Sequence, residues 1–147
     1  MGLTSCNDNK YQEPTPCKFN SKSIYLSVNQ NEWKYDDQKY QFYAHFTVPE
    51  ITSNVYNFGN FSLHRVYNLG QSNACQVGLP QSIYNMEIVD NGDGTTTELY
   101  YQQLVDYIIG VGYVELQVTN SDFLYPTDTQ GYLIYPEGMD FHLQLIY

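Results

Sequence analysis

Apolar and polar residues alternate with a period of two along four segments of this chain, residues 24–28, 40–48, 113–119 and 141–147. Successive side chains of a β-strand point to opposite faces, so this alternation is typical of strands that bury one face and expose the other. Polar turns separate the segments. The pattern predicts an all-β fold, an antiparallel β-sandwich of the immunoglobulin-like or jelly-roll-like kind.

One segment, "VPEITSNVYNFGN", breaks the alternation. Thr52 can cap the start of a helix, and Gly59 can end it. We therefore expect one short helical turn near residues 52-58, between two strands. A length of 147 residues suits one domain with a sizeable core, and we expect that domain to cover residues 23–147.

The segment "VDNGDGTTTE" has the Asp and Gly residues of either a calcium-binding loop or a hairpin turn. An EF-hand loop needs a glycine at its sixth position and a bidentate Glu at its twelfth. With Gly94 at the sixth position, Val89 takes the first ligand position and Tyr100 the last, so the spacing does not fit. The Asn-Gly and Asp-Gly pairs instead favour a turn between strands at 83–89 and 95–103. No metal site is expected.

The chain begins with Met-Gly followed by "LTSC", which ends at Cys6 and combines an aliphatic residue, two small residues and a cysteine. This tetrad resembles the lipobox of bacterial lipoproteins, in which cleavage precedes a cysteine that carries lipid. The resemblance implies that Cys6 holds the protein at a membrane through a lipid anchor. Two alternatives stay open: N-myristoylation, which would want Ser or Thr in place of the cysteine, and an unmodified thiol.

Residues 7–22, "NDNKYQEPTPCKFNSK", are mostly polar and contain two prolines that disfavour helix. We expect residues 1–22 to form a lipobox remnant and a flexible tether. Cys17 in this tether could pair with Cys75 as a disulfide if the protein is exported. Both could equally remain free thiols, because a bridge demands a Cα separation that a sequence does not reveal.

Three segments, "AHFTVPEIT", "VYNFGNFSLHRVY" and "QVGLPQSIY", contain a Pro-x-Ile-Thr motif, a glycine-led strand ending in Val-Tyr, and a later Leu-Pro pair. This combination resembles a set of uncharacterised exported proteins from Bacteroidota. The resemblance implies a β-sandwich and brings no established activity. Together with Cys6, it implies an outer-membrane lipoprotein of the bacterial cell envelope. The Asn-rich residues 7–9 are a partial match to a signal for export to the cell surface.

The net charge of −10, from 16 acidic and 6 basic residues, opposes binding to phosphate backbones. We therefore expect no nucleic-acid partner, and membrane contact only through the lipid. Nucleophile-elbow, phosphate-loop and dinucleotide motifs are missing. We expect no catalytic residues, no cofactor and no enzymatic activity. His45, His64 and His142 fall on the polar faces of their strands and are expected to be solvated.

Sixteen tyrosines are the most unusual part of the composition. Tyrosine is a good strand former, and outward-facing tyrosines beside Asn and Gln also suit a glycan or a protein partner. Tyr43, Tyr113 and Tyr100 are the candidate contact surface, whereas Trp33 is expected in the core. Two functions stay open. One is a non-catalytic protein-interaction or structural module, and the other is a carbohydrate-binding accessory lipoprotein that uses exposed aromatics.

Overall fold

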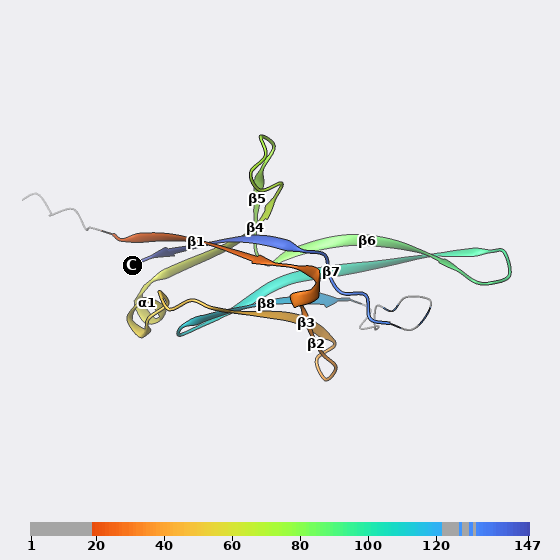
Figure 1. The fold of residues 1–147 in the computed structure, drawn as a ribbon, viewed down its shortest axis with the longest axis horizontal. Coiled ribbons are helices and arrows are strands. Elements are labelled where there is room, and N and C mark those ends of the chain that lie inside the picture. Colours follow the sequence, from red (N-terminus) through yellow and green to blue (C-terminus); the bar gives the residue numbers. More distant parts are fainter. Residues whose placement is uncertain (1–18, 122–126, 128–129, 131) are drawn as a thin grey trace, which may run out of the picture.

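The computed structural model describes residues 19–121, 127, 130 and 132–147, and it folds them into two antiparallel sheets that face each other (Figure 1). Sheet A has the strand order β1 (Ser21–Val28), β9 (Met139–Ile146), β4 (Asn60–Tyr67) and β5 (Cys75–Gly78). Sheet B has the order β2 (Lys34–Asp36), β3 (Gln41–Thr47), β8 (Tyr113–Asn120), β7 (Thr96–Gly110) and β6 (Gln81–Asp90). The prediction of an all-β antiparallel sandwich is confirmed.

The core lies between the two sheets and is made of the residues that the alternation assigns to the inner faces. The side chains with no exposed surface include Val114, Leu116 and Val118 on β8 and Phe141, Leu143 and Leu145 on β9. Burying one such side chain contributes about 1.5–3 kcal/mol. Tyr40 is an exception to the predicted inward face, because it lies in the β2–β3 turn with a φ of 52° and is 43% exposed.

Trp33 belongs to this core, as the sequence predicts. It follows a short 3-10 helix, η1 (Gln30–Glu32), and is only 3% exposed. Its indole Nε1 donates a hydrogen bond to the backbone carbonyl of Glu137 over 3.1 Å. The polar edge of the ring is therefore satisfied while its apolar body is buried.

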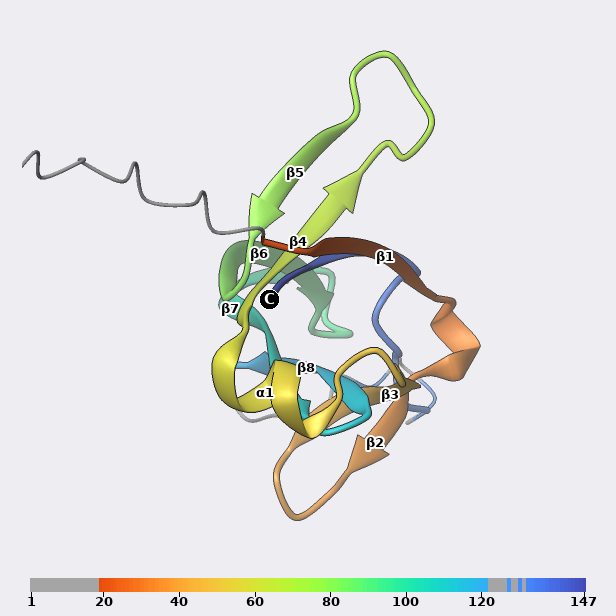
Figure 2. The same ribbon diagram turned by 90° about the vertical axis from the view of Figure 1, so that its left-hand side faces the viewer.

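The predicted helical turn is helix α1 (Ser53–Phe58), which closes one end of the sandwich (Figure 2). The Thr52 side chain accepts a hydrogen bond from the Val55 backbone amide, and the Gly59 amide donates to the Val55 carbonyl over 2.8 Å. A Cβ atom at Gly59 would lie 2.6 Å from that carbonyl oxygen. The residue that ends the helix is therefore restricted to glycine by close backbone approach.

The domain begins earlier than the sequence indicates. Ser21 and Lys22, which we assigned to the tether, belong to β1 and pair with β9. Asn20 extends this pairing through two backbone hydrogen bonds with Tyr147. Ser21 and Lys22 are polar, so the apolar alternation that predicts strands does not identify them. Only their backbone pairing with β9 shows that they belong to β1. Residues 1–18, with the predicted lipid site, lie outside the described residues.

Three hairpins extend from the sandwich in different directions (Figures 1 and 2). The β4–β5 hairpin and the β2–β3 hairpin leave on opposite sides, and the β6–β7 hairpin continues along the long axis. Strand β8 pairs with β7 only from Gln103 onward. Residues 84–102 therefore form a two-stranded ribbon beyond the five-stranded part of sheet B, and we call this ribbon the arm.

Candidate binding surface

Two of the predicted contact tyrosines, Tyr43 and Tyr113, lie on the outer face of sheet B, and both are half-buried. The Tyr113 ring stacks on His45 with 4.9 Å between ring centroids. The ring also covers Gly110, where an added Cβ would clash with the ring carbons Cε1 and Cζ. Tyr113 is therefore packed against its own sheet and offers a partner only part of its ring.

The third predicted tyrosine, Tyr100, lies on the arm and is 71% exposed. Its hydroxyl donates a hydrogen bond to Oε2 of Glu98 over 2.6 Å, and this bond raises the pKa of Tyr100 above its ordinary value. Tyr113 pairs with Gly110, ten residues further along β7. At a rise of about 3.3 Å per residue, roughly 33 Å separates the two positions. The structure does not bring the three predicted tyrosines together.

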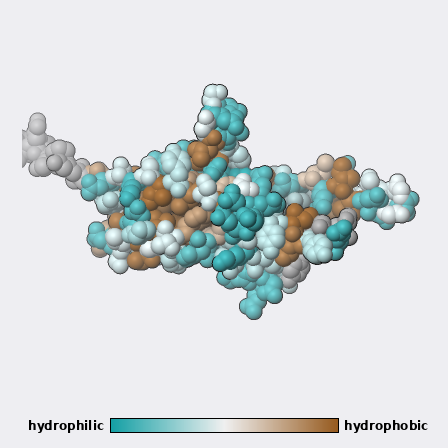
Figure 3. Space-filling view, in the orientation of Figure 1, coloured by the Kyte–Doolittle hydropathy of each residue, from teal (hydrophilic) through white to brown (hydrophobic). Residues whose placement is uncertain are grey.

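Tyr100 instead joins a group of apolar side chains that the sequence reasoning did not single out. The β6–β7 register pairs Met86 with Tyr100 and Ser82 with Leu104, so even-numbered residues of both strands share the outer face. We call the exposed apolar members of this face the apolar stripe: Tyr84, Met86, Ile88, Tyr100, Leu104 and Ile108. Figure 3 shows hydrophobic residues gathered on the arm, next to a hydrophilic tip.

The exposed fractions in the stripe are large for apolar residues. They range from 41% for Leu104 to 83% for Tyr84. Scattered apolar residues on a surface are ordinary, but a contiguous group is typical of an interaction site. The alternating pattern of β6 was the available signal, because "SIYNMEI" places Tyr84, Met86 and Ile88 on one face. That signal could not show that the face lacks a covering layer.

A cavity of about 310 Å³ lies at the base of the arm on the same outer face. It is lined by Ser82, Gln102, Leu104, Thr119, Asn120 and Ser121. Its shape is held by hydrogen bonds from Gln102, whose side-chain amide donates to the Ser82 hydroxyl and whose backbone amide donates to Ser121 Oγ over 2.9 Å. The apolar stripe thus passes a cavity beside Leu104 that has room for one inserted side chain.

The opposite face of the arm lines a more polar cleft. Its volume is about 280 Å³, and its lining includes Asn85, Tyr101, Gln103, Asn120 and Tyr135. Aromatic rings next to side-chain amides are the combination that suits a sugar ring with its hydroxyls. The outer face of the arm therefore carries apolar side chains beside Asp90 and Glu98, and its inner face lines the polar cleft and also exposes Leu99.

Charge is distributed unevenly along the chain. Residues 1–65 hold all six Lys and Arg and six of the 16 acidic residues, so residues 66–147 carry the whole net charge of −10. Arg65, the basic residue nearest to this acidic half in sequence, is 4% exposed and donates through Nη2 to Glu137 Oε1 over 2.6 Å. Its guanidinium also lies 4.5 Å from the centre of the Tyr67 ring. The positive charge of Arg65 is therefore buried and paired with Glu137, and it does not offset the negative charge on the surface of this half.

The predicted turn at the tip of the arm is confirmed. Gly92 and Gly94 have φ angles of 78° and 86°, which glycine adopts without strain. The Asp93 side chain accepts hydrogen bonds from the Thr95 amide and hydroxyl, and these lower the pKa of Asp93. Asp90 likewise accepts from the Gly92 amide. In the described part of the chain, no group of three or more His, Cys, Asp or Glu could hold a metal ion.

The histidines only partly follow the sequence interpretation. The His45 side chain is 49% exposed, as expected, and His64 is half-buried. The expectation of a solvated His142 was wrong, because its residue exposure is only 7%. Its ring stacks on Tyr25 at 4.6 Å, and Nδ1 lies 3.0 Å from Gln76 Oε1. The His142 side chain does point to the outer face, as expected, but Tyr25 and Gln76, which are distant in sequence, cover it.

The structure does not test the expectations of a lipid on Cys6 and a disulfide between Cys17 and Cys75. Cys6 and Cys17 lie outside the described residues, whereas Cys75 is exposed at the start of β5. The Cys17–Cys75 disulfide therefore stays a prediction. Among the described residues, no helix has the length and apolar character needed to span a membrane.

Comparisons with protein-family models, with curated proteins and with solved structures return no match to this chain.

Proposed function

We propose that this protein is a lipid-anchored component of a bacterial cell envelope and that its sandwich domain is a non-catalytic protein-interaction module. The observation that carries the proposal is the apolar stripe, which follows the outer face of sheet B from the arm into the body. Six apolar side chains from two adjacent strands are exposed there together. Water-exposed apolar surface of this extent is unfavourable unless a partner covers it in the working state.

The envelope location rests on the sequence. Cys6 in its lipobox-like tetrad would carry the lipid, and the polar residues after it would act as the tether. Sixteen extended residues reach roughly 50 Å, which holds a domain clear of a membrane surface. An anchored protein meets partners in the same membrane, so modest affinity is enough for association.

The anchor has a direct test. Full-length protein made in its source bacterium should partition into detergent, and Cys6→Ala should move it to the aqueous phase. Cys75→Ala is the matched control, since it also removes one thiol and should still partition into detergent. Detergent partitioning that survives Cys6→Ala would contradict lipid attachment at that residue.

The interaction function is tested with a photo-crosslinking amino acid at Tyr100 in the same bacterium. The control position is Phe58 on α1, which is 81% exposed and lies outside the apolar stripe. We expect a discrete protein adduct from Tyr100 and none from Phe58. Equal incorporation at both positions without a protein adduct from Tyr100 would contradict the proposal.

A carbohydrate-binding accessory is the second candidate, and the polar cleft on the inner face of the arm favours it. Tyr101 and Tyr135 supply rings there, and Asn85, Gln103 and Asn120 supply amides. Binding on a glycan array that is lost in Tyr101→Ala and kept in Tyr84→Ala would favour this candidate over the protein-interaction module.

A further inference from the structure

Strand β6 is a long edge strand without lysine, proline or a bulge. It is the last strand of sheet B, and all ten residues pair with β7 in continuous register without a bulge. Proteins commonly protect edges by short strands, charged side chains (lysine above all), prolines, bulges or a covering helix or loop. Strands β2 and β5 are three and four residues long, and β1 contains Lys22. Within the described residues, β6 is the one sheet edge that combines length with the absence of lysine and proline.

A free edge of this kind is suited to accept another strand. An added strand forms backbone hydrogen bonds with the edge, while side-chain contacts on the two faces select its sequence. The edge of β6 spans ten residues, or roughly 33 Å of extended chain. The two faces of β6 therefore define what a matching strand should carry.

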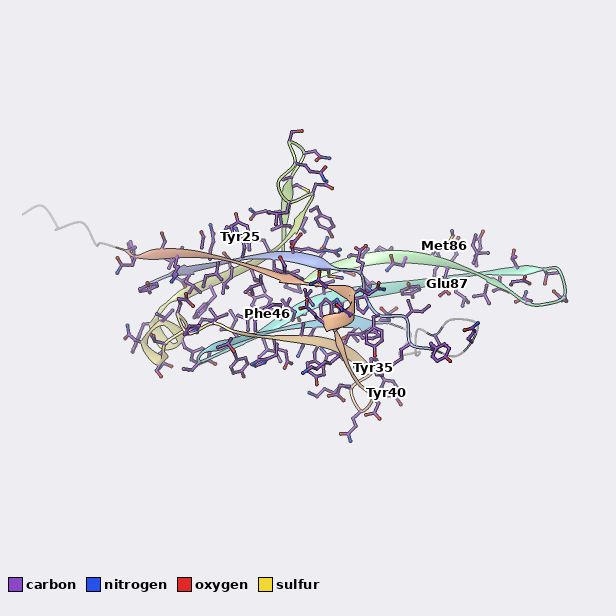
Figure 4. All side chains as sticks on the ribbon, in the orientation of Figure 1. Tyr25, Tyr35, Tyr40, Phe46, Met86 and Glu87 are labelled. Atoms are coloured by element: carbon purple, nitrogen blue, oxygen red, sulfur yellow. The ribbon has the colours of Figure 1, made fainter. Side chains whose placement is uncertain are left out.

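The two faces of β6 differ in chemistry along the arm. Tyr84, Met86 and Ile88 point to the outer face, and the intervening Glu87 points to the inner face. Figure 4 labels Met86 and Glu87, neighbours in sequence, on opposite sides of the ribbon. Glu87 is exposed, and no ion pair joins it to another described residue. A matching strand would place apolar side chains on the outer face and a cation next to Glu87.

Charge excludes a second copy of this chain as the preferred occupant. Besides Glu87, the arm carries Asp90, Asp93 and Glu98, and residues 66–147 contain no Lys or Arg. Two arms side by side would place like charges together, which costs free energy. A basic partner is instead attracted before contact, and its encounter rate rises at low ionic strength.

We propose that the edge of β6 binds, by strand addition, an extended segment of another protein in which apolar and basic residues alternate. This rests on the function proposed above and names the partner chemistry for the same surface. The apolar residues of the segment lie over the stripe, and its basic residues meet Glu87. The cavity beside Leu104 lies on the apolar side of the added strand.

The test uses synthetic peptides of about ten residues, the length of the β6 edge. The probe alternates Val and Lys. One control has the same composition arranged as a Val block and a Lys block, and a second alternates Val and Glu. Binding to the full-length protein is measured by fluorescence anisotropy at several salt concentrations. We expect the alternating Val–Lys peptide to bind at least about tenfold more tightly than either control, and its binding to weaken with salt.

Two charge-reversal variants locate the site. Glu87→Lys should weaken the binding of the alternating Val–Lys peptide by about tenfold or more. Asp37→Lys changes the net charge equally, but it lies in the exposed β2–β3 turn and should leave binding nearly unchanged. Both substitutions are at exposed positions, and circular dichroism checks that each variant folds.

Amide hydrogen exchange then reports the mode of binding. Bound peptide should slow exchange along residues 81–90 and leave the free edge of β1 unchanged. Equal affinity for the alternating and block peptides, or protection away from β6, would overturn strand addition. Concentration-dependent dimers that Glu87→Lys does not weaken would identify a second copy as the occupant and also overturn it.

The outcomes separate this inference from the proposed function. A protein adduct from Tyr100 that forms equally well in Glu87→Lys, together with no preference for the alternating peptide, would remove the strand-addition inference alone. Absence of any protein adduct from Tyr100 would remove the interaction function itself, whatever the peptides do.

Discussion

The body of the sandwich and the arm contain the same kind of alternating strand, but only the body buries its apolar face. Strand β7 runs through both regions. Val105, in the part that sheet A covers, has no exposed surface, whereas Leu99, six residues earlier on the same inner face, is 43% exposed. The difference lies in the second sheet, because alternation produces a two-faced strand and an opposing layer is needed to bury one face. The arm has only the neighbouring strand, and this unburied surface is what makes it a candidate for binding.

The largest contrast should appear in stability. Trp33→Ala removes a ring that is 3% exposed together with its hydrogen bond to Glu137, and we expect a loss of about 3–5 kcal/mol in the free energy of unfolding. Tyr84→Ala removes a ring of the arm that is 83% exposed, and we expect a change below about 0.5 kcal/mol. Urea unfolding of both variants measures the difference. A Trp33→Ala protein as stable as the parent would break the distinction between body and arm.

A smaller effect should come from the one arginine. The Arg65 side chain is 5% exposed and the Glu137 side chain is 74% exposed, so removing either partner leaves a different group behind. Glu137→Gln leaves a buried guanidinium without its carboxylate and should cost about 1–3 kcal/mol. Arg65→Met leaves a carboxylate that water can reach, and the methionine chain can fill the space, so the cost should be less.

Urea unfolding at neutral pH ranks these two variants. Glu98→Gln is a matched control on the arm, because it makes the same change at an exposed carboxylate. It should change stability by less than about 0.5 kcal/mol. If Arg65→Met proved more destabilising than Glu137→Gln, the burial of the guanidinium would not be the source of the effect.

The smallest effect concerns the tip of the arm. Hydrogen bonds from Thr95 lower the pKa of Asp93 below its ordinary value of 3.8. A lowered folded-state pKa means that the ionised carboxylate is the favoured form, so its contribution is present above pH 3.8 and is lost as the pH falls through the lowered value. Thr95→Val removes the hydroxyl bond and should raise the pKa of Asp93. Carboxyl NMR titration measures the shift, and an unchanged pKa would contradict the role of the hydroxyl.

The sequence was a good guide to local structure in both regions. Alternation identified the inward residues of β8 and β9, and the Thr52 and Gly59 signals bounded α1 correctly. The hairpin turn at the tip of the arm also followed from its glycines. These features depend on neighbours a few residues apart, which is why they can be predicted from one chain.

Features that depend on distant neighbours were missed. His142 is covered by Tyr25 and Gln76, and Tyr113 stacks on His45, so neither is as exposed as its position on the outer face suggests. Strand β7 extends seven residues beyond the predicted end at residue 103. The apolar stripe was missed for the same reason, since nothing in the local pattern of β6 shows which strands lie over it.

The most direct measurement of whether a partner covers the arm is amide hydrogen exchange on the protein in two states, purified and associated with its native envelope. In purified protein, amides along the unpaired edge of β6 should exchange faster than those of β8 in the core. In the envelope-associated protein, exchange along residues 81–90 should slow while that of β8 stays the same. Equal exchange along β6 in the two states would contradict a partner that binds the arm.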